Sequence, residues 1–165
     1  MARTTEHTVE SITALLQQVK DPEIPTISLI DLGVITDIII NTEQGVHIKM
    51  TPTFSGCPAM DYMKNNVEEV LAENGIANFK VEMNYDTQWT SNNITEAGLK
   101  ALKIHGLAPP PQHNLIIDID LLEKAKCPFC DSSDTSLKSP FGPTLCRSLH
   151  YCNSCSQAFE QFKPL

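Results

Sequence analysis

The sequence predicts an α+β protein in which a small αββαβα sheet-and-helix domain precedes a cysteine-rich tail. Three observations lead to this prediction. Apolar residues recur with helix and strand periods in turn as far as Gly106, three consecutive prolines follow at residues 109–111, and five of the six cysteines lie after residue 126. Because a proline run cannot continue a helix and often separates structural units, we expect a domain at 1–108, a Pro-rich linker and strand at 109–126, and a separate unit at 127–165.

The individual elements follow from local sequence patterns. Apolar residues three or four apart predict helices at residues 9–19, 58–75 and 96–105, and a turn or short helix at 121–126. Thr8 and Thr95 suit the N-terminal caps of the first and third of these helices. Strand-like alternation predicts strands at residues 34–40, 46–50, 79–85 and 115–119. In the first domain the helices have only the sheet to pack against, so all three are expected to cover it.

Composition and charge exclude several classes of protein. With 41% apolar and 19% charged residues, a chain of 165 residues has enough hydrophobic side chains for a compact core. Its formal net charge of -8 repels phosphate backbones and anionic lipids, which argues against nucleic-acid and membrane binding. The first residues lack the apolar segment of a signal peptide, and no stretch reaches the roughly 18 apolar residues of a membrane span, so we expect a cytoplasmic protein.

The tail contains two C-x-x-C pairs, Cys127 with Cys130 and Cys152 with Cys155. Two thiolates on one tight turn can fill two corners of a tetrahedron around zinc, and a second turn supplies the other two. A tail of this size cannot bury enough apolar surface to fold alone, so a structural zinc ion would supply the missing free energy. We therefore predict a zinc ribbon at residues 127–165.

Cys146 and His150 also lie in the tail, between the two pairs. In a closed four-cysteine site they have no coordination position, and a buried thiol and a packed histidine are the simpler interpretation. Spacing alone leaves open the alternative that Cys146 or His150 replaces one of the four cysteines at the metal. A redox C-x-x-C is another alternative, but it needs only one pair. Four thiolates also accept iron as well as zinc.

Cys57 stands apart from the other cysteines, where a loop leads into the second predicted helix. Pro58 suits the first position of a helix, which would make Cys57 the N-terminal cap. Unpaired N–H groups at that end would lower the pKa of the thiol and leave the sulfur able to bind a metal or attack an electrophile. A buried structural cysteine is the alternative, and spacing does not decide between the two.

Asp21, Glu23 and Asp31 form an acidic loop before the predicted hairpin, with Asp37 just beyond it. Carboxylates in such a loop can act as an acid–base pair or as ligands for a hard metal ion. Turn and capping roles are the simpler interpretation, because Asp-Pro and Asp-Leu-Gly are ordinary turn sequences. No glycine-rich phosphate loop and no Ser-His-Asp arrangement is recognisable in the sequence, so a nucleotide enzyme or a classical hydrolase is not expected.

Several stretches of the chain together resemble a known family. Residues 21–25, 30–34 and 52–59 are similar to the signature of the metal-sulfur cluster biosynthetic domain of SufT-like proteins, which makes residues 1–108 a metal-sulfur cluster assembly-like domain. The tail narrows the resemblance to the family of D subunits of ring-1,2-phenylacetyl-CoA epoxidases, through residues 139–146 and 159–163.

This resemblance implies a non-catalytic accessory subunit of a multicomponent oxygenase in phenylacetate catabolism. Its implied partners are the oxygenase and reductase subunits of the epoxidase, together with iron-sulfur assembly proteins. The resemblance also implies that Cys57, with Asp21, Glu23 and Asp31 nearby, is the functional thiol of the first domain. The leading hypothesis is a maturation factor of the oxygenase complex in which Cys57 holds iron or an iron-sulfur cluster transiently, or in which its loop docks on the client subunit. Two alternatives stay open: a permanent structural subunit without metal transfer, and a thiol oxidoreductase that uses Cys57 or Cys146.

Overall fold

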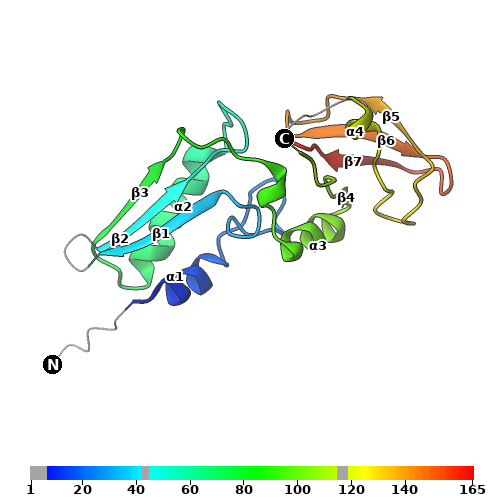
Figure 1. The fold of residues 1–165 in the computed structure, drawn as a ribbon. Helices are drawn as coiled ribbons and strands as arrows, with labels where there is room; N and C mark the ends of the chain where they lie inside the picture. The colour runs from blue at the N-terminus through cyan, green and yellow to red at the C-terminus, as the bar shows by residue number, and fades with distance from the viewer. Residues whose placement is uncertain (1–6, 42–44, 115–118) are drawn as a thin grey trace.

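The computed structural model describes residues 7–41, 45–114 and 119–165. It contains two sheets, one toward each end of the molecule (Figure 1). The first half of the chain forms a three-stranded sheet, the second half contributes most of a four-stranded sheet, and helices accompany both. The predicted α+β class and the element order αββαβα of the first domain are confirmed.

The elements have the following bounds. The first half contains α1 (Val9–Leu16), β1 (Ile35–Asn41), β2 (Gly45–Met50), α2 (Met60–Glu73), β3 (Phe79–Met83), η1 (Ser91–Asn93) and α3 (Glu96–His105). The second half contains β4 (Leu107–Ala108), α4 (Ile119–Glu123), β5 (Thr135–Ser139), β6 (Arg147–Cys152) and β7 (Ala158–Phe162). The strand predicted at 115–119 lies almost entirely outside the described residues, and the helix predicted at 121–126 overlaps α4. None of the helices in the part of the chain that the structure describes combines the length and apolar character needed to cross a bilayer.

Alternation along the strands gives the first sheet one apolar and one polar face. β1 and β2 run antiparallel, whereas β2 and β3 run parallel. Ile38, Ile48 and Val81 lie in one row across the three strands and pack in the same core as residues of α1 and α2. Lys49 and Glu82 form a row of charged residues on the opposite face. α1 and α2 therefore cover a single face of the sheet.

α3 lies beside the end of the sheet, so the expectation that all three helices cover it is wrong (Figure 1). The helix begins at the Thr95 cap, as predicted, and the Thr95 hydroxyl donates to Oδ1 of Asp31 at 2.8 Å. The hydroxyl of Thr26 donates to the carbonyl of Ala101 at 2.8 Å. Gly98 allows this close approach, because a Cβ at that position would lie 2.5 Å from the carbonyl oxygen of Asp31. α3 therefore packs on the acidic loop.

One helix end differs from the sequence prediction and one agrees with it. α1 ends at Leu16 rather than at Val19, because the chain turns there and the Val19 carbonyl accepts the N–H of Leu29 at 3.0 Å. α3 ends at Gly106 as predicted, and this glycine has the left-handed φ of +91° that closes many helices. The end of α3 is determined by the local conformation of Gly106, whereas the end of α1 depends on a hydrogen bond to the more distant Leu29.

The segment that leaves α3 joins the sheet of the tail. β4 pairs in parallel with β7, with Leu107 opposite Glu160 and Ala108 opposite Gln161. β7, β6 and β5 then pair antiparallel, which gives the strand order β4-β7-β6-β5. Two residues at the end of the predicted first domain are therefore strand partners of the tail.

The two halves of the chain share one hydrophobic core. Trp89 is 2% exposed, and its indole N–H donates to the carbonyl of Leu32 at 3.1 Å. Its ring meets Phe162 of β7 edge-on, with the ring centroids 5.9 Å apart. Phe162 and Cys146 of the tail are buried in the same cluster as the core of the first domain. Burial of apolar side chains therefore docks the tail on the first domain.

We expect Trp89→Ala to lower the free energy of unfolding by about 3–5 kcal/mol, the usual cost of removing a buried aromatic ring. The change leaves a cavity beside Phe162 and removes the hydrogen bond to Leu32. Urea unfolding in zinc-containing buffer measures the effect. Tyr85→Ala is the control, because that side chain is 71% exposed and its removal should change stability by less than about 0.5 kcal/mol. Equal stability of the two variants would contradict the shared core.

Candidate functional site

The sulfur atoms of four cysteines converge in the tail and form what we call the zinc cage. All four lie within 4.8 Å of one another, and the Sγ–Sγ distances are 3.7 Å between Cys127 and Cys155 and 3.6 Å between Cys130 and Cys152. Zinc–sulfur bonds of about 2.3 Å in a tetrahedron place neighbouring sulfur atoms about 3.8 Å apart. The four cysteines therefore fit a tetrahedral zinc ion, and the protein fills every ligand position.

Two similar tight turns build the zinc cage. The N–H of Asp131 donates to the carbonyl of Cys127 at 3.0 Å, and the N–H of Ser156 donates to the carbonyl of Cys152 at 2.9 Å. Asp131 and Ser156 both have φ of 60°, a left-handed conformation that closes each turn. The N–H of Cys155 lowers the pKa of the Cys152 thiol to about 7, whereas burial and the neighbouring sulfurs raise the pKa of Cys155 to about 12. Full ionisation of the cage therefore depends on a bound cation.

Cys146 and His150 lie outside the zinc cage. His150 is buried, its Nε2 lies 2.9 Å from the hydroxyl of Ser148, and its ring stacks on Phe159 with centroids 5.4 Å apart. Burial lowers the pKa of His150, which keeps the imidazole neutral. Cys146 is buried in the shared core, and its Sγ lies 3.1 Å from the hydroxyl of Thr144. Neither residue belongs to the cluster of four sulfurs found among the described residues.

A cavity of about 450 Å³ lies where the first domain meets the tail. The first domain contributes Asp21 and Glu23 from the acidic loop and Cys57 from the loop before α2. The tail contributes Cys146, the residue before β6. Two thiols and two carboxylates from distant parts of the sequence thus line one space. The sequence analysis did not predict that Cys146 would lie in this cavity. The one feature of the sequence that could have drawn attention to it is that it is the fifth cysteine of the tail and belongs to neither C-x-x-C pair.

Cys57 is half-buried in a tight turn, and the prediction that it caps α2 is wrong. Its N–H donates to the carbonyl of Phe54 at 3.3 Å, and Gly56 within this turn has φ of +84°. α2 begins only at Met60, with Ala59 in the cap position. Burial raises the pKa of the Cys57 thiol, negative neighbours add to this, and only the N–H of Ala59 acts in the other direction. The expected lowering of the pKa is therefore also wrong, and the thiol is protonated at neutral pH.

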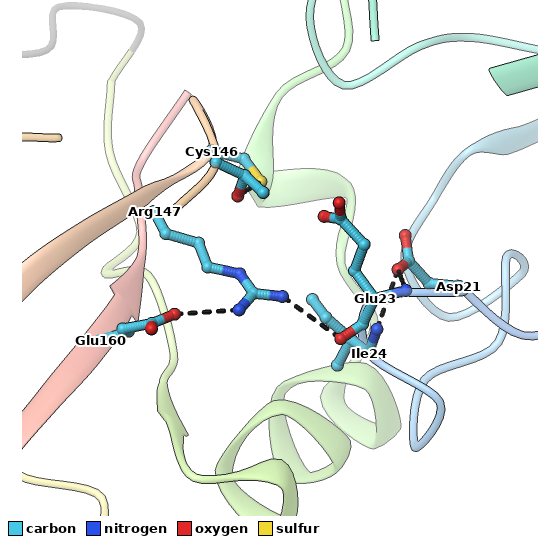
Figure 2. A network of polar contacts seen from close by, with 7 residues as sticks. Asp21, Glu23, Ile24, Cys146, Arg147 and Glu160 are labelled. Carbon is cyan, nitrogen blue, oxygen red and sulfur yellow. Dashed lines mark hydrogen bonds and ion pairs between the residues drawn. The ribbon is translucent and has the colours of Figure 1, made fainter. Parts of the chain in front are cut away.

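Asp21 shapes the acidic loop and lines the cavity. Its Oδ1 accepts the N–H of Glu23 at 2.8 Å and the N–H of Ile24 at 3.0 Å (Figure 2). Burial raises the pKa of the Asp21 carboxyl, and these two N–H groups and the Arg147 guanidinium oppose that change. The turn interpretation therefore applies to Asp21, although its carboxylate also remains part of the cavity wall.

Arg147 connects the tail to the acidic loop (Figure 2). Its Nη1 lies 2.9 Å from Oε2 of Glu160 on the neighbouring strand, and its Nη2 donates to the carbonyl of Glu23 at 3.3 Å. The second contact crosses the junction between the two halves of the chain. Sequence reasoning missed this residue because Glu23 is 124 positions away. Arg147 thereby helps to hold the adjacent Cys146 opposite the acidic loop.

Asp31 does not line the cavity with the other two acids of the loop. Its Oδ1 accepts the hydroxyl of Thr95, and its Oδ2 accepts the hydroxyl of Ser28, both at 2.8 Å. Asp37 lies on β1 and is exposed. The acidic loop thus has two parts: Asp21 and Glu23 belong to the cavity, and Asp31 anchors α3.

Comparison with known proteins matches two parts of the chain to two different family models. Residues 10–83 match the model of the family described as iron-sulfur cluster assembly protein, and residues 119–163 match that of the PaaD zinc beta ribbon domain. Over 155 residues the chain is 36% identical to an Escherichia coli (strain K12) protein whose name makes it the D subunit of a 1,2-phenylacetyl-CoA epoxidase, covering 94% of this chain and 92% of the relative. The chain belongs to this family of D subunits. The resemblance noted from the sequence is confirmed.

Two further relatives correspond to the first domain. The chain is 30% identical to a Porphyromonas gingivalis Fe-S protein maturation auxiliary factor, over 58% of the chain and 90% of the relative. The crystal structure of a domain of unknown function, DUF59, from Bacillus anthracis superimposes with a TM-score of 0.53 at 26% identity, covering 58% of this chain and 91% of that one. The D-subunit family therefore combines an assembly-type domain with a zinc ribbon.

We expect Cys127→Ser to abolish stoichiometric zinc binding, because three thiolates cannot close the tetrahedron. Cys146→Ser and His150→Ala should each retain one zinc ion per chain, because neither side chain is part of the zinc cage. Metal analysis after dialysis against a weak chelator measures the zinc content. Loss of zinc from either of the last two variants, with Cys127→Ser still loaded, would contradict the assignment.

Alkylation of Cys57 by iodoacetamide is expected to be slow at pH 7 and to increase about tenfold per pH unit to beyond pH 9, because only the thiolate reacts and burial raises the pKa of the thiol. Asp21→Asn removes a nearby negative charge but keeps an oxygen for the two N–H groups, so it should lower this pKa and speed alkylation at pH 8 about two- to fivefold. Peptide mass spectrometry follows the rate, and Cys57→Ser identifies the modified site. A rate that is already maximal at pH 8 would contradict the raised pKa.

Proposed function

We propose that the protein is a non-catalytic accessory subunit of a phenylacetyl-CoA epoxidase that assists maturation of an iron-sulfur or di-iron centre of the oxygenase complex through Cys57. The observation that carries the proposal is the position of the Cys57 thiol in a cavity lined by two carboxylates, at the junction of an assembly-type domain and a zinc ribbon. Thiolate and carboxylate side chains both bind iron. A thiol that is only half-buried can also be reached by a partner protein that takes over the iron. The name of the Porphyromonas gingivalis relative supports the maturation role, and that of the Escherichia coli relative supports the link to the epoxidase.

The zinc ribbon has a structural part in this proposal. A closed four-cysteine site leaves the metal no position for chemistry. Zinc would join the turn between β6 and β7 to the turn at Cys127 and Cys130, whereas Cys146 and Phe162, at the other end of the two strands, pack against the first domain. The ribbon then forms one side of the surface that meets the oxygenase and reductase subunits and the iron-sulfur assembly proteins. The proposal includes work in the cytoplasm, a reducing compartment in which a free thiol such as that of Cys57 is kept reduced.

A permanent structural subunit is the second candidate, and the name of the Escherichia coli relative as a subunit favours it. In that case the zinc ribbon would be essential and Cys57 would be dispensable. Purification of the complex through a tag on the oxygenase distinguishes the permanent subunit from the maturation factor. A fixed stoichiometry favours the permanent subunit, whereas a substoichiometric amount favours a maturation factor.

In cells that carry the oxygenase and reductase, we expect Cys57→Ala to reduce the iron and sulfide content of the client proteins and the oxidation of phenylacetyl-CoA by about tenfold or more. The physical reason is the loss of a thiol ligand from the cavity, at a position that is only half-buried, so that alanine should disturb the fold little. Metal and sulfide analysis of the purified clients measures the effect.

Ser55→Ala is the matched control, because Ser55 is exposed in the same turn and does not line the cavity. Normal metal content and normal oxidation in the Cys57→Ala strain would reject the role of the thiol. A defect of equal size in the control would point to the loop itself rather than to the sulfur.

A further inference from the structure

The ionisable groups that line the cavity between the first domain and the tail are all acids. Asp21, Glu23, Cys57 and Cys146 are its ionisable members, and each becomes an anion when it loses its proton. Among the described residues that line this space there is no histidine, lysine or arginine. A concave space lined by carboxylates, with no positive side chain to offset them, concentrates negative potential and attracts a cation.

Cys146 occupies a fixed position in the wall of this cavity. It is 8% exposed, and its carbonyl accepts the N–H of Lys163 at 2.8 Å. Arg147, the next residue, is held by Glu160 and by the carbonyl of Glu23. The backbone hydrogen bond of Cys146 and the side-chain contacts of Arg147 restrain this part of the chain. The Cys146 side chain therefore lines the same cavity as Asp21, Glu23 and Cys57. The zinc cage makes no use of it.

The charges around the two thiols oppose ionisation unless a cation is present. Burial is the main reason that the pKa values of Cys57 and Cys146 are raised, and Asp21 and Glu23 raise both further. The nearby cation is Arg147, whose guanidinium is already paired with Glu160. A divalent cation would replace the thiol protons and remove the repulsion among the four groups.

We propose that Cys57 and Cys146 together bind a borderline-soft divalent cation such as Fe²⁺, with Asp21 or Glu23 as a further ligand. This inference deepens the proposed function, on which it rests, by giving the maturation thiol a partner supplied by the zinc ribbon. Binding releases one proton from each thiol to solvent and forms two metal–sulfur bonds, and the oxidation state of the metal does not change. Thiolates select such cations over Mg²⁺ and Ca²⁺, which prefer oxygen ligands.

The ligands of this site are brought together by the cation itself. Among groups of three or more histidine, cysteine or acidic residues in the described part of the chain, only the zinc cage already has its ligand atoms placed to hold a metal, so the cavity side chains must move toward one another on binding. A change of χ1 between staggered rotamers moves a cysteine sulfur by about 3 Å, which allows the two thiols to close on a metal. With two or three protein ligands, the cation keeps positions for water or for a ligand from the client.

Anaerobic titration of the zinc-loaded full-length protein with Co²⁺ tests the site, because thiolate coordination of cobalt gives an absorption band that carboxylates alone do not produce. We expect one further equivalent of Co²⁺ to bind with this band while the zinc content stays constant. Cys57→Ser and Cys146→Ser should each weaken binding by more than about 100-fold, since even residues that only support metal ligands change affinity by about 10- to 100-fold.

Leu149→Ala is the control for Cys146, because Leu149 lies on the strand that follows it and does not line the cavity. Cys146→Ala is a second variant that keeps the site apolar if serine perturbs the core. Unchanged cobalt binding in both Cys146 variants, or no thiolate band in the unmodified protein, would overturn the two-thiol site and leave the Cys57 proposal standing. A band that needs both thiols, together with normal maturation in Cys57→Ala cells, would support the site and reject the proposed function.

Discussion

Packing of Phe162 against Trp89 determines where the tail sits on the first domain, and therefore which side chains meet in the cavity. Phe162 belongs to β7, which pairs with β4 and β6, while Trp89 is held by its hydrogen bond to the carbonyl of Leu32. Burial of the two rings favours association of the two halves, and the hydrogen bond from Arg147 to the Glu23 carbonyl is a second, directional contact across the junction. Together with the pairing of β4 and β7, the ring contact brings the two halves of the chain to one shared site.

The protein uses sulfur in two environments with opposite properties. In the zinc cage, four thiols lie close together, backbone N–H groups point at them, and the pKa of Cys152 is lowered to about 7. At the cavity, burial and neighbouring acids keep Cys57 and Cys146 protonated. The first arrangement favours permanent coordination of one ion. The cavity keeps its two thiols protonated. Because the thiolate is the form that reacts with oxidants, this protonation protects them from oxidation.

Sequence patterns predicted the parts of the fold that depend on neighbouring residues. The Thr95 cap, the Gly106 end of α3 and the C-x-x-C turns are all decided within about four residues of chain, and each is observed. Cys57 was misplaced because the turn that contains it also depends on the left-handed Gly56, which delays the start of α2.

The remaining features depend on contacts between distant segments. α3 packs on the acidic loop because Gly98 fits against the Asp31 carbonyl, and no periodicity in the helix indicates that partner. Cys146 reaches the cavity only after the tail has docked, so its spacing from the other cysteines carried no information about its neighbours. In the candidate site, the residue types near Cys57 were predictable, whereas the residues that the tail contributes were not.

The pairing of β4 with β7 has a mechanical consequence. Because Leu107 and Ala108 continue directly from α3 into the ribbon sheet, the three prolines that follow are not a free hinge between two bodies. Swinging the ribbon away would require rupture of this short parallel ladder and exposure of Phe162 to water. The two walls of the cavity are therefore expected to keep their relative position when a partner binds, because both belong to one connected frame.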